Sequence, residues 1–241
     1  MNTVEVIFEN EDVAVLSKPS GLSVHKDGTR VEETLADWFV ARFPESKGVG
    51  EPLVLTNGTS IDRPGIVHRL DKETSGVIIL AKHQNSFLYL KQQFKNREVQ
   101  KKYRAFLWGV MPDESGVIEL PIGRSKSDFR KRSAERGAKA PLRDALTKWK
   151  KLSASGDFSY VEASPQTGRM HQIRVHFKAL QHPLVGDCLY APKREYALGF
   201  DRLALHALSL TISISPGEKR TFEALLPPDF IEAEKQLSLQ V

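Results

Sequence analysis

The chain has 241 residues, of which 40% are hydrophobic and 27% are charged, and its formal net charge is +5. This balance is typical of a globular protein. No run of about 18 apolar residues occurs, which excludes a transmembrane helix, and the acidic N-terminus lacks the apolar core of a signal peptide. The single cysteine, Cys188, excludes an internal disulfide and fits a reducing compartment. We therefore expect a cytoplasmic protein.

Local patterns in the first half of the chain predict short strands separated by few helices. We expect strands at residues 4–8, 13–16 and 77–81, helices at 31–43 and 86–94, and a long surface loop at 44–64 that is rich in Gly, Pro, Ser, Thr and Asn. The sequence at 77–81, Val-Ile-Ile-Leu-Ala, is short, β-branched and apolar, as buried strands are.

The second half of the chain has the same character. We expect strands at 103–108, 117–120, 148–150, 158–163, 202–214 and 220–226, with 117–120 a candidate partner of 103–108. Met170, Ile173, Phe177 and Leu180 step by three, four and three residues, which predicts an amphipathic helix. We find no internal repeat, low-complexity linker or domain boundary. Consecutive strands with few helices favour an α+β fold in a single domain spanning residues 1–241.

Positive charge is concentrated between residues 124 and 143. Eight basic residues face two acidic ones there, so the segment has a net charge of +6, more than that of the whole chain. Such runs usually form a solvated loop, but they also bind nucleic-acid phosphates. Taken alone, the segment favours the solvated loop. Its basic residues are Arg124, Lys126, Arg130, Lys131, Arg132, Arg136, Lys139 and Arg143.

Several catalytic signatures are absent from the sequence. The chain has no Gly-x-Ser-x-Gly motif, no Walker A lysine loop and no dinucleotide-binding glycine pattern. His171 and His176 are five residues apart and would point to different faces of a helix, which disfavours a zinc site on them. One cysteine also excludes thiolate metal clusters. We therefore expect no metal site.

A polar segment, His-Arg-Leu-Asp-Lys-Glu-Thr-Ser-Gly at residues 68–76, stands between two apolar stretches. Charged groups between core strands must be paired or lie at the rim of a cleft. One interpretation is a hairpin loop whose charges pair with one another. The other is a functional loop on a rigid scaffold. The residues alone give the two interpretations equal weight.

Five ordered segments resemble the RluA family of pseudouridine synthases. The string GIVHRLDKETSG at 65–76 is similar to the signature of that family, whose aspartate corresponds to Asp71. The family's other motifs resemble, in the same order, KPSGLSVH at 18–25, KKYRAFLWG at 101–109, TGRMHQIRVHFKALQHPLVGDCLY at 167–190 and RLALHA at 202–207. The resemblance implies the pseudouridine synthase catalytic fold, with a mixed, mostly antiparallel sheet flanked by helices and loops and a central RNA-binding cleft.

The resemblance also implies an isomerase. Uridine becomes pseudouridine when the N1–C1′ bond breaks, the base turns and C5 bonds to C1′, which needs no cofactor. Asp71 is implied as the catalytic carboxylate. Whether it attacks the base, attacks C1′ or assists glycal formation stays open.

A buried carboxylate without a partner would tend to become neutral, so the site should supply a cation. Arg174 matches the family's arginine partner of the aspartate. Helical geometry also places Arg174 at the edge of the buried face of its helix, and the alternative there is a surface arginine.

Four further residues take roles from the resemblance. Tyr103 is implied to face the base, with a core tyrosine as the alternative. Arg69 is implied to enter the RNA stack where the target nucleotide leaves, with a salt bridge to Glu73 as the alternative. Leu205 is a candidate to pack the flipped base or to be a core leucine. His171 is a candidate phosphate contact.

RNA as the substrate makes the basic segment a candidate phosphate-binding arm, with Arg124, Lys126, Arg130 and Lys131 as RNA contacts. We expect a monomer that acts on structured ribosomal or transfer RNA, without a membrane or metal partner. Because the first strands begin near residue 4, the N-terminal S4-type RNA-binding domain of many relatives is expected to be absent.

Two other functions remain open at this stage. One is a non-catalytic RNA-binding or RNA-folding factor on the same fold, which an intact set of Asp71, Tyr103 and Arg174 disfavours. The other is a hydrolase that uses Asp71 with His68. It is disfavoured because residues three apart on a turning segment are poorly placed as a nucleophile–base pair and no oxyanion motif accompanies them.

Overall fold

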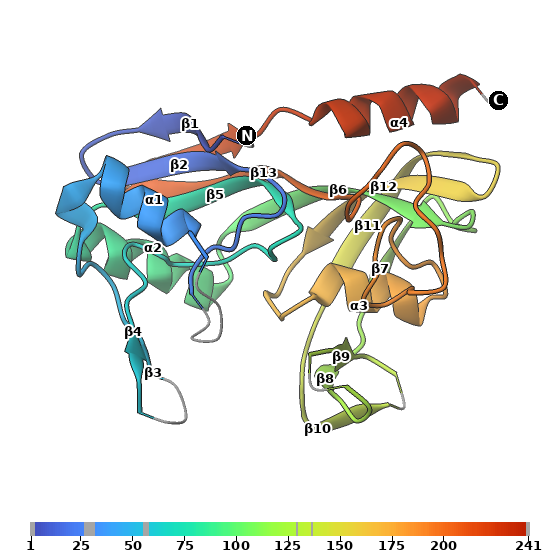
Figure 1. Cartoon of the computed structure of the whole chain (residues 1–241), viewed down its shortest axis with the longest axis horizontal. Coiled ribbons are helices and arrows are strands. Elements are labelled where there is room, and N and C mark those ends of the chain that lie inside the picture. Colours follow the sequence, from blue (N-terminus) through green and yellow to red (C-terminus); the bar gives the residue numbers. More distant parts are fainter. Residues whose placement is uncertain (1–2, 27–31, 55–57, 129, 136, 240–241) are drawn as a thin grey trace. The chain divides into compact units, whose positions relative to one another are not determined.

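The structure is a computed structural model that describes residues 3–26, 32–54, 58–128, 130–135 and 137–239 (Figure 1). The chain divides into two compact units, each built from two stretches of sequence. Unit 1 comprises Met1–Gln100 and Ala207–Leu225, and unit 2 comprises Lys101–His206 and Leu226–Val241. Within the described ranges, no helix is long and apolar enough to cross a membrane.

Unit 1 is built on a sheet whose strands follow the order β1-β2-β5-β13, with β14 paired to β13. The β1–β2, β2–β5 and β13–β14 pairs are antiparallel. Asn10 closes the first hairpin, because its side-chain oxygen accepts hydrogen bonds from the backbone N–H groups of Asp12 and Val13 at 3.0 and 2.8 Å. The strands are β1 (Glu5–Glu9), β2 (Val13–Lys18), β5 (Ser75–Ala81), β13 (Leu205–Ser215) and β14 (Glu218–Glu223).

Strand β5 is the centre of the unit 1 core. All seven of its residues are buried, as expected for its apolar, β-branched sequence. Gly76 has a positive φ of 114°, and a Cβ built on it would lie 2.1 Å from the backbone oxygen of Ala207. Only glycine fits here, so this residue sets how closely β5 and β13 approach.

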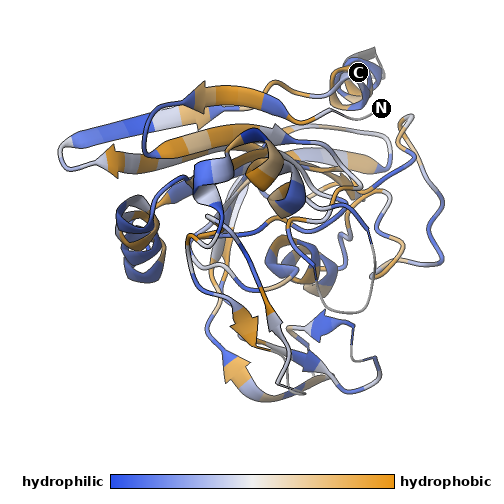
Figure 2. Cartoon of the chain, turned by 60° about the vertical axis from the view of Figure 1, so that its left-hand side comes forward, coloured by the Kyte–Doolittle hydropathy of each residue, from blue (hydrophilic) through white to orange (hydrophobic). Residues whose placement is uncertain are grey.

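Two helices flank the unit 1 strands. Helix α1 (Leu35–Arg42) begins with a capping box in which Thr34 accepts from the N–H of Asp37 and the Asp37 carboxylate accepts from the N–H of Thr34. Helix α2 (Gln84–Asn96) buries Phe87 and Leu90, while Leu88 is exposed, so apolar and polar residues both occur along its ribbon in Figure 2. Both helices were predicted. Residue 31, the predicted start of the first, lies outside the described residues.

The expected loop at 44–64 is partly structured. It contains a short 3₁₀ helix, η1 (Pro44–Ser46), and a two-stranded antiparallel pair, β3 (Leu53–Val54) with β4 (Ser60–Ile61). Residues 55–57 between these strands lie outside the described residues. The prediction of a long surface loop was therefore wrong for η1, β3 and β4.

Unit 2 contains an antiparallel sheet in the order β6-β12-β11-β7. The predicted pairing of 117–120 with 103–108 was wrong, because β7 pairs with β11 and two strands separate it from β6. Alternation of apolar residues fixes which face of a strand is buried but not which strand lies beside it. The strands are β6 (Gln100–Trp108), β7 (Ser115–Ile118), β11 (Thr147–Ser155) and β12 (Phe158–Pro165).

The basic segment forms a second, small sheet in unit 2. Its strands β8 (Ile122–Ser125), β9 (Arg132–Ser133) and β10 (Ala138–Arg143) follow the order β10-β8-β9, and both pairs are antiparallel. The interpretation of this segment as a solvated loop was therefore wrong for most of its described residues.

Unit 2 also contains two helices, α3 (Gln172–Ala179) and α4 (Pro228–Leu239). Helix α3 lies within the predicted stripe. Helix α4 was not predicted, and it packs Phe230, Ala233 and Leu237 into a core cluster with Phe106 and Tyr160. In the part of the chain that the structure describes, mostly antiparallel strands with four α-helices confirm the α+β class. The assignment of residues 1–241 to a single catalytic domain stays a prediction.

Candidate active site

The polar segment of unit 1 is held in place through its backbone. The carbonyl oxygen of Lys72 accepts hydrogen bonds from the ammonium of Lys18 at 3.0 Å and from the N–H of Gly21 at 2.9 Å. The next carbonyl oxygen, of Glu73, accepts from the hydroxyl of Ser20 at 2.7 Å. These contacts fix the chain immediately after Asp71, which is half-buried.

Lys18 is fully buried, which is unusual for a lysine. Its ammonium donates to three backbone carbonyl oxygens, those of Pro19 and Leu22 at 2.8 Å and that of Lys72 at 3.0 Å. Three donors meeting three acceptors compensate the loss of water around the charge. The motif at residues 18–25 therefore clamps the loop that carries Asp71.

The neighbours of Asp71 in the loop have different surroundings. His68 accepts a hydrogen bond on Nε2 from the N–H of Ile79 at 3.1 Å, and its ring stacks on Phe94 with centroids 4.5 Å apart. Because it binds the backbone of β5, His68 has a structural role, which argues against a hydrolase that uses it as a base. Arg69 is exposed, and its guanidinium lies 3.3 Å from His25 Nε2.

In unit 2, the turn before α3 is fixed by one glutamine. The side-chain oxygen of Gln172 accepts from the hydroxyl of Thr167 at 2.7 Å and from the N–H of Arg169 at 3.0 Å. Its amide nitrogen donates to the carbonyl oxygen of Leu146 and to the hydroxyl of Thr147, both at 3.0 Å. This anchoring sets the direction in which α3 presents its residues.

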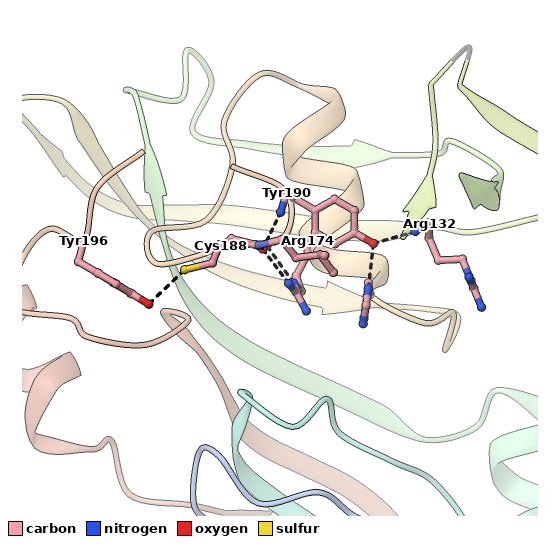
Figure 3. Close-up of polar contacts among 8 residues, drawn as sticks. Arg132, Arg174, Cys188, Tyr190 and Tyr196 are labelled. Atoms are coloured by element: carbon pink, nitrogen blue, oxygen red, sulfur yellow. Dashed lines mark hydrogen bonds and ion pairs between the residues drawn. The ribbon is translucent and has the colours of Figure 1, made fainter. Parts of the chain in front are cut away.

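Arg174 makes a buried, two-pronged ion pair. Its Nε and Nη2 donate to the two carboxylate oxygens of Asp187 at 2.8 and 2.7 Å, and the guanidinium lies over the ring of Tyr190, 5.0 Å from its centroid (Figure 3). Arg174 is only 7% exposed. Bidentate pairing fixes the plane of the guanidinium as well as its position.

Tyr190 connects this pair to the basic sheet. Its hydroxyl forms hydrogen bonds with His171 Nδ1 at 2.8 Å and with the N–H of Arg132 in β9 at 2.9 Å (Figure 3). The backbone N–H of Tyr190 donates to Asp187 at 3.0 Å. His171 has a left-handed backbone with φ 56°, and its ring meets that of Tyr190 edge-on, with centroids 5.6 Å apart. One tyrosine thus links the start of α3, the ion pair and the small sheet.

Tyr103 and Leu205 lie in the same apolar environment. Leu205 is 4% exposed and belongs to a buried cluster that includes Ala105 and Ile173. Tyr103 is partly buried and packs against this cluster. The contact of either residue with a flipped base stays a prediction.

The small sheet places like charges side by side. On β8, Arg124 lies opposite Arg132 of β9 and opposite Lys139 of β10. Like charges in directly opposite positions are destabilising unless an anion lies between them. Arg124, Lys126 and Arg130 are exposed, but Arg130 donates two side-chain hydrogen bonds to the carboxylate of Asp128 at 3.0 and 2.8 Å.

Comparison with known proteins decides the family. A family model described as RNA pseudouridylate synthase matches residues 12–179. The chain belongs to the RNA pseudouridylate synthase family. An uncharacterised RNA pseudouridine synthase of Bacillus subtilis is 37% identical over 235 residues, which cover 97% of this chain and 73% of that protein.

Two further relatives agree with this assignment. Ribosomal large subunit pseudouridine synthase D of Borreliella burgdorferi is 35% identical over 230 residues, which cover 95% of this chain and 67% of that protein. The solved structure of human RNA pseudouridylate synthase domain containing 4 superposes with a TM-score of 0.74 at 26% identity and covers 97% of this chain and 93% of its own. The RluA-type recognition and the isomerase class are confirmed.

The structure refines the predicted site of this pseudouridine synthase within each unit. Asp71 belongs to unit 1, whereas Tyr103 and Arg174 belong to unit 2, so the pairing of Asp71 with Arg174 stays a prediction. Arg174 is buried, which rules out the alternative of a surface arginine and corrects its placement at the edge of the helix face.

Sequence reasoning missed three residues that hold the site residues in place: Lys18, Asp187 and Tyr190. Asp187 and Tyr190 lie in the quoted motif at 167–190, thirteen and sixteen residues after Arg174. An aspartate in the same motif as the arginine was the available signal, because a guanidinium needs a carboxylate wherever it is buried.

Proposed function

We propose that this RNA pseudouridine synthase isomerises uridine in ribosomal RNA of the large subunit, with Asp71 as its catalytic carboxylate. The observation that carries the proposal is the backbone clamp on the Asp71 loop, because a catalytic carboxylate must keep its position while the base leaves and returns. Relatives from Borreliella burgdorferi and Neisseria meningitidis, named ribosomal large subunit pseudouridine synthase D, support the choice of RNA.

The reaction defines what the site residues must do. The N1–C1′ bond breaks, C5 bonds to C1′, C5 loses its proton and N1 gains one. We propose that Asp71 acts on the base or the ribose and that Arg174 balances its negative charge. Tyr103 faces the base, and its hydroxyl is available for the proton transfer that the reaction requires. Leu205 packs against the base.

RNA binding is assigned to three parts of the chain. The exposed guanidinium of Arg69 takes the place of the extruded nucleotide, which offsets part of the few kcal/mol that unstacking costs. The row of Arg124, Arg132 and Lys139 binds backbone phosphates together with Lys126, Arg130 and Lys131, because phosphates relieve the repulsion within the row. His171 is proposed to contact a phosphate beside them.

The location and assembly of the protein follow from the same chemistry. We propose a cytoplasmic monomer, because its substrate is cytoplasmic and its one cysteine, Cys188, forms no disulfide within the described part of the chain. Sedimentation of the purified protein tests the monomer.

Deletion of the gene in its host, followed by mapping of pseudouridines across ribosomal and transfer RNA, tests the proposed function. We expect loss of at least one site in large-subunit ribosomal RNA, restored by the wild-type gene but not by Asp71→Asn. Loss in transfer RNA alone would overturn the choice of RNA. Full restoration by Asp71→Asn would overturn the role of Asp71 and favour a non-catalytic RNA-binding factor.

A second assay separates binding from chemistry. Release of tritium from RNA that carries tritium at uridine C5 reports the loss of the C5 proton. We expect release with the wild-type protein and none above background with Asp71→Asn, while both proteins bind the RNA with similar affinity.

A further inference from the structure

Strand β6 separates two kinds of positive charge. Alternate residues of a strand point to opposite faces. On one face, Lys102 and Arg104 share the carboxylate of Glu162: Lys102 lies 3.2 Å from it, and Arg104 forms the second ion pair. On the other face lie Lys101 and Tyr103, followed by Ala105 and Leu107 of the core cluster. Lys101 and Lys102 are adjacent in the sequence, but their ammonium groups lie on opposite faces of the strand and have different partners.

Lys101 lacks the compensation that other buried cations have. Its ammonium donates one long hydrogen bond, 3.4 Å to the carbonyl oxygen of Thr167. Among the described residues it forms no ion pair, whereas Lys18 donates to three carbonyl oxygens. Burial without a neighbouring carboxylate lowers the pKa of Lys101 to about 8.

The ammonium of Lys101 is also next to an open stretch of backbone. Gly168 is exposed, and a Cβ built on it would lie 4.0 Å from the Lys101 nitrogen. Because this position is glycine, no side chain covers the ammonium from that side. The turn that contains Thr167 and Gly168 leads directly into α3, which carries Arg174. Lys101, on the same strand as Tyr103, therefore reaches the turn that precedes the helix of Arg174.

Only one of the three N–H groups of this ammonium has a hydrogen-bond acceptor among the described residues. Keeping such a cation partly buried costs free energy unless an anion binds it during function. Phosphates are the anions that an RNA substrate carries at neutral pH. We propose that Lys101 binds a backbone phosphate of the RNA at or next to the target nucleotide. This inference rests on the proposed function and adds a substrate-binding residue to it.

A lysine that binds phosphate makes the affinity for RNA depend on pH, whereas a lysine with only a structural role does not. A bound phosphate raises the pKa of the ammonium, so above pH 8 the free protein must take up a proton in order to bind RNA. Affinity should then fall between pH 8 and 9 by up to about tenfold. Arginine stays charged throughout this range, so Lys101→Arg should not show this fall.

Filter binding of the host's large-subunit ribosomal RNA, transcribed without modifications, measures these affinities at pH 7 to 9. Proteins carry Asp71→Asn so that no turnover occurs. At pH 7 we expect Lys101→Met to bind about tenfold more weakly and to reduce the slope of log K against log salt by about 0.7–0.9. Lys102→Met, on the opposite face, is the matched control and should keep the pH dependence of its parent.

Three outcomes would overturn the role of Lys101. One is wild-type affinity and salt slope in Lys101→Met. Another is a fall in affinity above pH 8 that persists in Lys101→Arg, which would assign the titration to another group. The third is a tritium-release rate that rises through pH 8 with unchanged affinity, which would indicate proton transfer by the neutral amine. If Lys101→Met fails to fold, the comparison of wild type with Lys101→Arg decides alone.

Failure of this inference differs from failure of the proposed function. A protein that releases tritium normally but binds RNA without any contribution from Lys101 contradicts only the phosphate contact. A wild-type protein that releases tritium from neither ribosomal nor transfer RNA contradicts the proposed function itself.

Discussion

Replacement of Asp187 by asparagine tests how strongly the buried ion pair organises unit 2. Asparagine has the same shape and keeps an oxygen for the backbone N–H groups of Leu189 and Tyr190, which donate to Asp187 at 3.2 and 3.0 Å. It removes the charge that faces Arg174 and places an amide NH2 donor opposite the Arg174 Nε–H, in the position of the second carboxylate oxygen. Because Arg174 is 7% exposed and the Asp187 side chain is fully buried, solvent cannot replace the lost partner.

The size of the expected loss in stability follows from the Arg174 charge that remains buried without a partner. Removal of one member of a buried ion pair costs about 3–5 kcal/mol, because the other charge remains without compensation. We expect Asp187→Asn to lower the free energy of unfolding of unit 2 by about 3 kcal/mol. Asp187→Ala should cost about 1 kcal/mol more for each backbone N–H that loses its acceptor. The double variant Arg174→Met, Asp187→Leu should recover the part of the loss that comes from the unpaired charge, but not the part that comes from these two N–H groups.

Urea unfolding followed by tryptophan fluorescence measures these differences. Trp149 of β11 packs edge-on against Phe177 of α3, with centroids 6.4 Å apart, so its emission reports on the element that carries Arg174. A value for Asp187→Asn within about 0.5 kcal/mol of wild type would refute the reasoning, since surface ion pairs contribute that little. So would a double variant that is less stable than either single one.

Two further perturbations probe the fold. Gly76→Ala should destabilise unit 1 by about 3 kcal/mol or more, because its Cβ would lie 2.1 Å from a backbone oxygen at a φ of 114°, whereas Gly217→Ala, with a φ of 81° and nothing within 4 Å, should cost only about 1 kcal/mol in urea unfolding. Burial lowers the pKa of His176 below 6.5, so the neutral form is favoured in the folded state; its contribution to stability is complete above pH 6.5 and lost as pH falls through the lower folded pKa. Unfolding curves from pH 8 to 5 should show this loss, and His176→Asn should not.

The tautomer of His176 follows from its two hydrogen-bond partners. Its Nε2 faces the carbonyl oxygen of Leu120 at 3.0 Å and therefore carries the proton, while Nδ1 faces the hydroxyl of Thr147 at 2.9 Å. Because Nδ1 then carries no proton, the hydroxyl donates to it, and the same oxygen accepts from Gln172. A second ring proton on Nδ1 would displace the hydrogen bond that this hydroxyl donates.

The sequence was sufficient where a single physical signal dominates. The apolar run of β5 identifies a buried strand, because a strand that is buried on both faces consists almost entirely of apolar residues. The three-four-three spacing of apolar residues identifies α3, because a helix with one buried face repeats apolar residues at that spacing. Helix α4 was missed although Phe230, Ala233 and Leu237 follow helical spacing after Pro228. The periodic pattern of α4 is therefore present in the sequence.

Other features depend on contacts that no local pattern records. The pairing of β7 with β11 depends on the path of the whole chain, and the alternation within β7 is equally compatible with β6. The β8, β9 and β10 strands are polar and short, so their order comes from backbone pairing and from the hydroxyl of Tyr190. Asp71 was identifiable from its motif, but the clamp from Lys18 joins residues 54 apart.

The division of the chain has a consequence for its synthesis on the ribosome. Strand β5 is complete at Ala81, but its neighbour β13 begins only at Leu205, after nearly all of unit 2. On the edge that faces away from β2, the N–H groups of Ile79 and Ala81 already donate to His68 and Gly65. At about 5–20 residues per second, the first half of this edge stays unpaired for about 6–25 seconds. An unpaired apolar edge invites association with other chains. Nascent chains that stall between these two strands are therefore the ones we expect to depend on chaperones.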